Sequence, residues 1–266
     1  MSKMFENCNS LASLDLSKFD TTSVVKMDEM FTQCVSFTFL DLSSFRTPSL
    51  KTMYAMFYNN DKLTSVDLSN FNTTLVENMG QVFDQCHSIK SLNLSHFETP
   101  NVVFIWHLFY NCMNLEFIDI RNFITDKVEG FDGLFINCHS LTSIDIRHFN
   151  TTNAKNMEFM FYGCKSITSL DLSNFKTESV TKINHMFKDC YKLTSLDLKN
   201  FHTPYLQSIE EMFCNCNDLK FVDITNIITD NTTKMDYLFL GCHNLQSVDI
   251  TRFDTSLVTS MESMFM

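Results

Sequence analysis

The sequence is poor in the residues that interrupt regular structure. Its 266 residues include only five glycines, three prolines and one tryptophan. Stretches rich in glycine, proline or serine indicate linkers or low-complexity segments, and this sequence has none. It also lacks a run of about 18 apolar residues, the length that a membrane span requires. We therefore expect one continuous domain over residues 1–266, without a membrane span.

Basic residues are scarce as well. The chain has 20 Lys and Arg against 31 Asp and Glu, which gives a formal net charge of −11. The basic residues do not cluster. Because Lys and Arg supply most of a protein's affinity for nucleic acid, we expect no nucleic-acid partner.

The sequence does contain a repeat of 26 residues that no insertion or deletion interrupts. One column of the repeat is threonine in every copy from Thr21 to Thr255. Another column is phenylalanine in all eleven copies: Phe5, Phe31, Phe57, Phe83, Phe109, Phe135, Phe161, Phe187, Phe213, Phe239 and Phe265. A fixed period of this length predicts a solenoid, in which each coil buries its apolar side against its neighbours.

Each repeat contains a short segment that reads as a strand. In Leu11-x-x-Leu14-Asp15-Leu16, the alternation of side chains predicts that Leu14 and Leu16 face the core and that Asp15 faces solvent. Strands in successive coils would then stack into a parallel sheet.

The next segment of the repeat has the spacing of an amphipathic helix. Val24, Met27, Met30, Phe31 and Cys34 fall on one helical face, and the threonine column suits the helix N-cap. Helices need about 8–10 Å between axes and strands only about 4.8 Å, so the stack should curve. The predicted fold is an α/β, right-handed, leucine-rich-repeat-like solenoid. It has about ten strand–turn–helix coils of 26 residues, with the parallel sheet on the concave side.

One family resembles this repeat closely. The segment Asn156–Cys164 followed by Leu170–Phe175 carries the motif M-x-x-M-F-x-x-C and then L-D-L-S-x-F. This motif resembles the BspA-type leucine-rich repeat, also called the bacterial surface protein 26-residue repeat. The likeness extends over the whole chain, with Asn60, Asn93 and Ile227 as mild departures.

The resemblance implies a secreted or cell-surface protein that adheres to host proteins or to other cells. It supplies no catalytic residues and no cofactor, and the sequence has no catalytic triad, phosphate loop or H-E-x-x-H motif. We therefore expect a non-enzymatic protein-recognition or adhesion module. Its partner would be a protein, such as one on the surface of a host or neighbouring cell.

Two sets of residues are the candidate binding residues on the concave face. The first, which we call the Asp column, comprises Asp15, Asp41, Asp67, Asp119, Asp145, Asp171, Asp197, Asp223 and Asp249. The second is Phe39, Phe117 and Phe221, where most copies have serine. The Asp column is either an acidic stripe for a basic partner or Ca²⁺, or a structural row that accepts hydrogen bonds from nearby Ser, Thr or backbone groups. The three rings either anchor a partner or cover the neighbouring coil.

Nine of the ten cysteines form another column: Cys8, Cys34, Cys86, Cys112, Cys138, Cys164, Cys190, Cys216 and Cys242. Neighbours in a stack lie within disulfide range, but their side chains run parallel. We expect buried free thiols that bind no metal, with Cys214, outside the column, as the accessible one. Ten thiols fit a reducing compartment. The chain also begins with repeat sequence rather than a signal peptide, so a cytoplasmic location remains open beside the surface location.

The first and last coils have the sequence of ordinary copies, without a polar cap. Solenoids need capped ends because an uncapped coil exposes its apolar edge. We therefore expect head-to-tail self-association, suppressed by charged substitutions at Leu14 or Ile250. This supports a second functional hypothesis, a structural module that assembles end to end.

Overall fold

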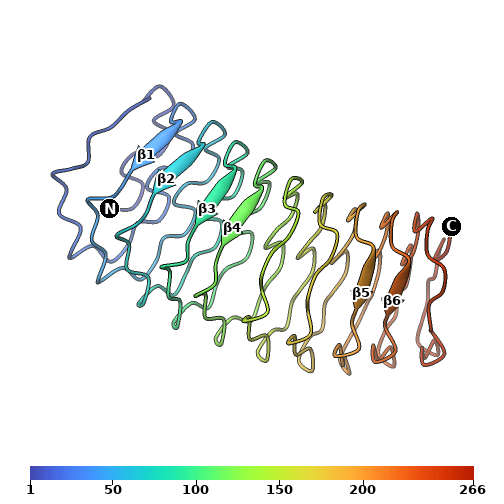
Figure 1. The fold of residues 1–266 in the computed structure, drawn as a ribbon. Coiled ribbons are helices and arrows are strands. Elements are labelled where there is room, and N and C mark those ends of the chain that lie inside the picture. Colours follow the sequence, from blue (N-terminus) through green and yellow to red (C-terminus); the bar gives the residue numbers. More distant parts are fainter.

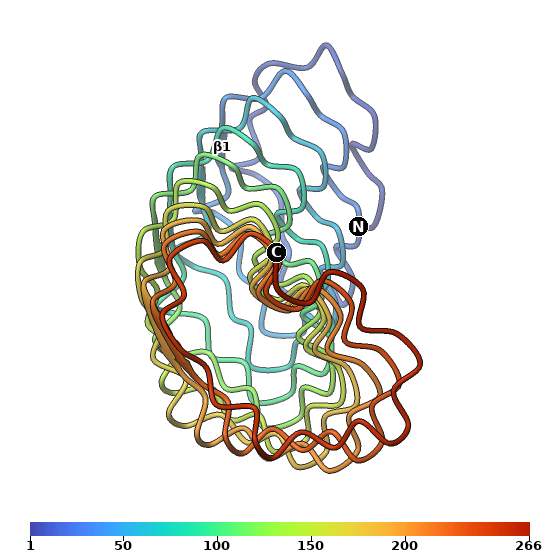
Figure 2. The ribbon, with the colours of Figure 1, turned by 90° about the vertical axis from the view of Figure 1, so that its right-hand side faces the viewer.

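The chain folds into a stack of coils in which each turn is one repeat (Figure 1). The computed structural model describes all residues 1–266. We number the coils from the one that contains Asp15 (coil 1) to the one that contains Asp249 (coil 10). Seen from one end, the coils lie one behind another, and each is turned slightly relative to the last (Figure 2). The predicted solenoid is confirmed.

Six coils contain a three-residue strand at the predicted position. The strands are β1 (Phe39–Asp41), β2 (Ser65–Asp67), β3 (Ser91–Asn93), β4 (Phe117–Asp119), β5 (Ser195–Asp197) and β6 (Phe221–Asp223). They pair in parallel as β1–β2, β3–β4 and β5–β6, with a register of one repeat. We call the surface that carries these strands, and the equivalent residues of the other coils, the strand face. The middle residue of each strand faces the core and its neighbours face outward, as the alternation predicted.

The predicted helix does not form. In residues 27–34, the amides of Glu29 and Phe31 donate to the carbonyls of Tyr54 and Met56 in the next coil, at 2.8 and 2.9 Å. An α-helix would direct each amide to the carbonyl four residues earlier in its own segment. Glu29 and Gln33 also have positive φ angles of 54° and 58°, which a right-handed helix excludes. No helix of the structure is long and apolar enough to cross a membrane.

Residues 27–34 and their equivalents form instead a chain of tight turns, which we call the turn segment. Met30 donates to the carbonyl of Met27, and Cys34 to that of Phe31. Turns in which an amide donates to the carbonyl three residues earlier place apolar side chains on one side, at nearly the same sequence spacing as a helix does. Met27, Met30, Phe31 and Cys34 are indeed all buried. The apolar pattern was therefore correct as a pattern of burial and wrong as evidence for a helix.

The wide helix layer that was expected to curve the stack is absent, so the reason for placing the sheet on the concave side no longer holds. Amides of the turn segment bond to the next coil in every coil, whereas the strand pairing is interrupted between coils 3 and 4 and between coils 5 and 8. Ring centroids in the Phe31 column lie 5.2–5.9 Å apart. In the Phe45 column, next to the strands, they lie 6.0–6.4 Å apart. The coils are thus packed more closely at the turn segment than at the strand face.

One aromatic column runs through the whole stack. All eleven phenylalanines from Phe5 to Phe265 stack on their neighbours, with interplanar angles of at most 16°. Nine of them, from Phe31 to Phe239, belong with residues from the other apolar columns to one hydrophobic core that contains 72 buried residues.

The threonine column has a different role from the predicted N-cap. Thr21 Oγ1 donates to the carbonyl oxygen of Arg46 in the next coil at 2.8 Å and accepts the Arg46 amide at 2.9 Å. Every threonine of the column from Thr21 to Thr229 donates to the next coil in the same way. These side chains are buried, and each hydroxyl is a hydrogen-bond partner for the backbone of the next coil, so the column connects successive coils.

We expect Phe135→Ala to lower the free energy of unfolding by about 3–5 kcal/mol, the usual cost of truncating a buried phenylalanine. Phe135 is fully buried and stacks between Phe109 and Phe161, so the cavity affects two coil interfaces. Denaturant unfolding followed by circular dichroism measures the loss. Phe117→Ala is the control, because Phe117 is 59% exposed. Equal midpoints for both variants would contradict the prediction.

Candidate functional site

The nine carboxylates of the Asp column lie in one row on the strand face, exposed or half-buried. Where strands pair, they stand directly opposite one another: Asp41 faces Asp67, and Asp197 faces Asp223. The structure thus brings together the predicted carboxylates.

Each carboxylate of the Asp column closes a turn within its own coil. Its Oδ1 accepts the backbone amide two residues later at 2.9–3.3 Å, as in Ser43 to Asp41. Asn93 does the same with the amide of Ser95, at 3.1 Å. Aspartate and asparagine both favour this turn. The structural interpretation is therefore correct in part, although the bond stays within one coil and does not connect neighbouring coils.

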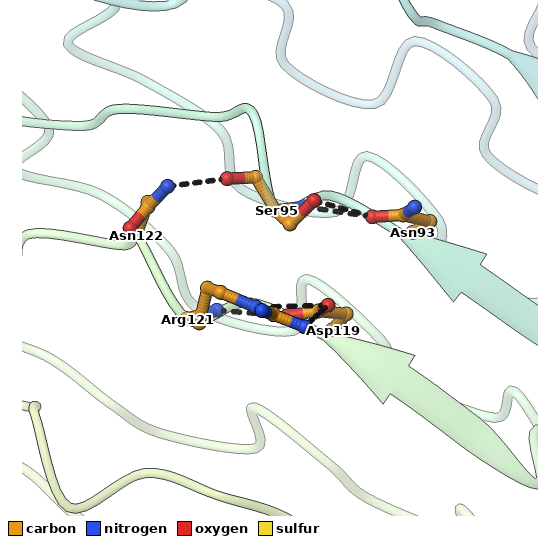
Figure 3. A network of polar contacts seen from close by, with 5 residues as sticks. All are labelled: Asn93, Ser95, Asp119, Arg121 and Asn122. Atoms are coloured by element: carbon orange, nitrogen blue, oxygen red, sulfur yellow. Dashed lines mark hydrogen bonds and ion pairs between the residues drawn. The ribbon is translucent and has the colours of Figure 1, made fainter.

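Three carboxylates of the column are neutralised by a basic residue of the same turn. Arg147 Nη2 lies 2.8 Å from Asp145 Oδ2, and Lys199 Nζ lies 2.9 Å from Asp197 Oδ2. Figure 3 shows the third pair, in which Arg121 reaches both carboxylate oxygens of Asp119. Hydrogen bonding to Arg147 lowers the pKa of Asp145 to about 2. The other six carboxylates, Asp15, Asp41, Asp67, Asp171, Asp223 and Asp249, form no ion pair.

A row of asparagines, which the sequence analysis did not single out, connects these turns to one another. Asn122 Nδ2 donates to the carbonyl of Ser95 in the previous coil at 2.6 Å (Figure 3). The same bond recurs at Asn70, Asn174, Asn200 and Asn226. Asparagine recurs at this position of the repeat, and this recurrence is the sequence signal that could have predicted the row. These bonds hold the turns, and so the carboxylates, in fixed positions.

The three predicted aromatic residues project outward from β1, β4 and β6. Phe39, Phe117 and Phe221 are 52%, 59% and 53% exposed, and each stands opposite a serine of the paired strand. Phe117 lies three coils after Phe39, and Phe221 lies four coils after Phe117, so the three rings do not form one cluster. More than half of each residue is exposed, so the three rings remain accessible and do not serve mainly to cover a neighbouring coil.

Three hollows lie on the strand face beside these residues. One, of about 370 Å³, is lined by Phe117, Asp119, Arg121, Ile144 and Asp145, among others, and one of about 320 Å³ is lined by Ser143, Ile144, Asp145, Arg147 and Asp171. A smaller one, of about 110 Å³, lies between the carboxylates of coils 1 and 2. No group of three or more His, Cys, Asp or Glu side chains is arranged to hold a metal ion, and each Asp of the column already accepts a hydrogen bond. The geometry offers charged and aromatic contacts on an open surface.

The sequence profile of one protein family matches the chain from end to end. The family is described as "Mycoplasma protein of unknown function, DUF285", and its matches cover residues 1–92, 41–137, 103–221 and 207–266. The chain belongs to this family. No curated protein matches the DUF285 chain. The finer assignment to the BspA-type repeat stays a prediction.

Solved structures similar to the DUF285 chain are leucine-rich repeat proteins. One from T. pallidum is 20% identical, with 65% of this chain and 72% of that chain covered and a TM-score of 0.42. One from Bacteroides ovatus is 18% identical, with coverages of 93% and 74% and a TM-score of 0.37. A leucine-rich cell surface protein from Faecalibacterium prausnitzii is 16% identical, with coverages of 96% and 69% and a TM-score of 0.39. These similarities are too low to transfer a function.

All ten cysteines of the DUF285 chain are free. In eight coils the thiol donates to the carbonyl of the phenylalanine 29 residues earlier, at 2.9–3.3 Å. Asn60 replaces the cysteine in one coil and serves the same carbonyl, that of Phe31, at 2.7 Å. The thiols therefore satisfy buried carbonyls, and burial raises the pKa of Cys34 to about 11.

The expectation that Cys214 is the accessible thiol is wrong. Cys214 is only 2% exposed, whereas Cys8 and Cys242 are half-buried. Its row contains long side chains such as Lys188, and a short side chain between longer ones is covered by them. The mixture of polar and apolar residues at the positions equivalent to Cys214 suggested exposure, but it did not indicate that longer side chains would cover the cysteine.

Pulsed alkylation of the native chain at about pH 8 should therefore label Cys8 first and Cys242 more slowly. The remaining thiols should react only after unfolding, because the thiolate is the reactive form and burial disfavours it. Mass spectrometry of peptides measures the order. Labelling of Cys214 as fast as Cys8, or intramolecular disulfides, would contradict the structure.

The turn segment contains two buried carboxylates, Asp236 and Asp84, which the sequence did not lead us to expect. Of the two, only Asp84 has a buried carboxylate oxygen without a hydrogen-bond partner. It is 2% exposed. Gln81 Nε2 donates to its Oδ2 at 2.8 Å, and its Oδ1 has no hydrogen-bond partner. Burial raises the pKa of Asp84 to about 7, against the smaller opposing effects of Gln81, Gln85 and His87.

Asp84 should make the DUF285 chain less stable as the pH rises. Its folded pKa lies above its unfolded pKa, so its protonated form favours folding and this advantage is lost between about pH 4 and pH 7. By pH 8 the loss would amount to at most roughly 4 kcal/mol. The test compares Asp84→Asn with the unmodified chain by denaturant unfolding at pH 4.5 and pH 8. We expect the variant to be the more stable at pH 8, by a larger margin than at pH 4.5. A pH-independent difference between the two would refute this role.

Proposed function

We propose that the DUF285 chain is a non-enzymatic protein-recognition or adhesion module that binds its partner through the strand face. The observation that carries the proposal is the combination of the Asp column with three exposed phenylalanines on one surface. Exposed aromatic rings are frequent anchors of protein interfaces. The turns beneath the carboxylates are fixed by hydrogen bonds within and between coils, so a partner would meet a surface that is already ordered.

The charge of this surface defines the partner's chemistry. Six of the nine carboxylates lack an ion pair, and the chain as a whole is acidic. A partner that presents Lys or Arg to the column would therefore be attracted, and one with an acidic surface would be repelled. We extend the proposal to a secreted or cell-surface location and a host or neighbouring-cell protein as partner, which the resemblance to the BspA-type repeat supports.

The test uses variants that keep the fold. Replacing the six unpaired aspartates by asparagine should leave the turns intact, because Asn93 already makes the same turn. Replacing the three exposed phenylalanines by serine gives each position the residue that most other coils have there. Each variant and the unmodified chain would be used to capture proteins from surface extracts of host or neighbouring cells.

We expect both variants to lose the proteins that the unmodified chain captures. Binding should also weaken as salt rises, since charges are screened over about 10 Å at 0.1 M. Circular dichroism confirms that each variant is folded. Capture that is indifferent to salt and to both sets of substitutions would reject the strand face as the binding surface.

A further inference from the structure

The three exposed phenylalanines differ in the charges that surround them. Phe117 lies in the same strand as Asp119, which Arg121 neutralises, and the next coil contains the pair of Asp145 and Arg147. This middle part of the strand face therefore carries as many positive as negative charges beside its ring.

The surroundings of Phe221 are intermediate. Asp223 in the same strand forms no ion pair. The previous coil nevertheless contributes Lys199, which is paired with Asp197 and close enough to Asp223 for the two charges to interact. The local charge is negative but partly compensated.

Phe39 alone is flanked by carboxylates that no cation compensates. Asp41 lies in its own strand, Asp15 in the coil before and Asp67 in the coil after. The pKa of Asp15 and that of Asp41 are lowered by hydrogen bonds from Ser17 and Ser43, without a contribution from any basic residue.

Two basic residues lie on the turns that follow these carboxylates, and neither forms an ion pair with them. Lys18 forms no ion pair, and the guanidinium of Arg46 donates to the backbone carbonyls of Ser43 and Phe45. The strand face of coils 1 to 3 thus presents three uncompensated carboxylates around one exposed ring.

The geometry of these coils leaves room for a cation. The hollow of about 110 Å³ is lined by Asp15 and Asp41 together with the hydroxyl-bearing Ser17, Ser43 and Ser44. The ring of Phe39 stands opposite Ser65, a small residue that leaves its flank open. Carboxylates and hydroxyls are acceptors for the donors of an ammonium or guanidinium group.

We propose that the strand face of coils 1 to 3 binds a basic protein segment in which Lys or Arg residues flank an apolar side chain. One cationic group enters between Asp15 and Asp41, the apolar side chain packs on Phe39, and a further cation meets Asp67. An extended segment that runs along the stack places such side chains at intervals of about 6.6 Å, which flexible Lys and Arg stems can match to the coil spacing. This inference rests on the proposed function and specifies which coils of the strand face bind the partner.

The experiment uses two synthetic peptides as probes, Lys-Lys-Leu-Lys-Lys and Lys-Lys-Gly-Lys-Lys, and Glu-Glu-Leu-Glu-Glu as the charge-reversed control. Their affinities are measured by fluorescence anisotropy at low salt against the full chain and four variants. Asp15→Asn/Asp41→Asn/Asp67→Asn removes the charge of coils 1 to 3. Asp171→Asn/Asp223→Asn/Asp249→Asn is its matched control, with the same change in net charge. Phe39→Ser and Phe117→Ser test the ring.

We expect the substitutions in coils 1 to 3 to weaken binding of the leucine peptide at least about fivefold, and the control substitutions less than about twofold. The leucine peptide should bind the unmodified chain and Phe117→Ser several-fold more tightly than the glycine peptide does. Phe39→Ser should abolish this difference, because the partner of the leucine is then absent.

Two outcomes would overturn the inference, and they are distinguishable. If the control substitutions weaken binding as much as those in coils 1 to 3, or if Phe117→Ser rather than Phe39→Ser abolishes the leucine effect, the location is wrong while recognition by the strand face stands. If no variant changes binding and Glu-Glu-Leu-Glu-Glu binds equally well, both the location and the proposed function fail.

Discussion

Every coil of this protein depends on the next coil for its backbone hydrogen bonds. In the turn segment, alternate amides donate to carbonyls of the neighbouring coil, and each threonine of the buried column from Thr21 to Thr229 donates there as well. A neighbouring coil that covered these groups without supplying partners would leave them unpaired away from water, which is costly. The stack therefore forms only if equivalent residues meet at every step, and one inserted residue would displace all later partners. This explains why the 26-residue period is uninterrupted and why Phe5 to Phe265 can stack as one column.

The same constraint separates positions that the fold fixes from positions that it leaves free. The cysteine column satisfies a buried carbonyl, and Asn60 does so equally well, so the fold requires a donor of that size there rather than a thiol. By the same reasoning, the turn at the Asp column requires a side-chain oxygen and not a charge, because Asn93 closes it as Asp41 does. Asparagine would avoid the repulsion between carboxylates in neighbouring coils. Closing this turn therefore does not require a negative charge, and the charge at nine of ten positions supports the proposal that the strand face binds a partner.

The sequence allowed a correct prediction of the repeat, the strands and the outward carboxylates, because each of these follows from a pattern within one repeat. The helix was predicted wrongly because the apolar spacing at Met27, Met30 and Phe31 records burial and does not record where the amides donate. A further signal was present. The column of Gln33 has a positive φ in every coil and holds mainly Asn, Gly and Asp, the residues that tolerate this conformation. The ion pairs of Arg121, Arg147 and Lys199 could not be predicted from spacing alone, since the side chain of a basic residue two positions after Asp can equally extend into solvent.

These three ion pairs divide a surface that is otherwise uniform. Where Arg121 and Arg147 bind the carboxylates of their own turns, the repulsion along the Asp column is already relieved, and an incoming cation would have to displace an existing partner. In coils 1 to 3 no basic residue forms an ion pair with Asp15, Asp41 or Asp67, so these three carboxylates stay uncompensated in the free chain. A basic partner would supply there the positive charges that the arginines supply in the middle coils. Its binding would not require any ion pair within the fold to break. The difference between equivalent coils, rather than the repeat itself, thus determines where a partner is best accommodated.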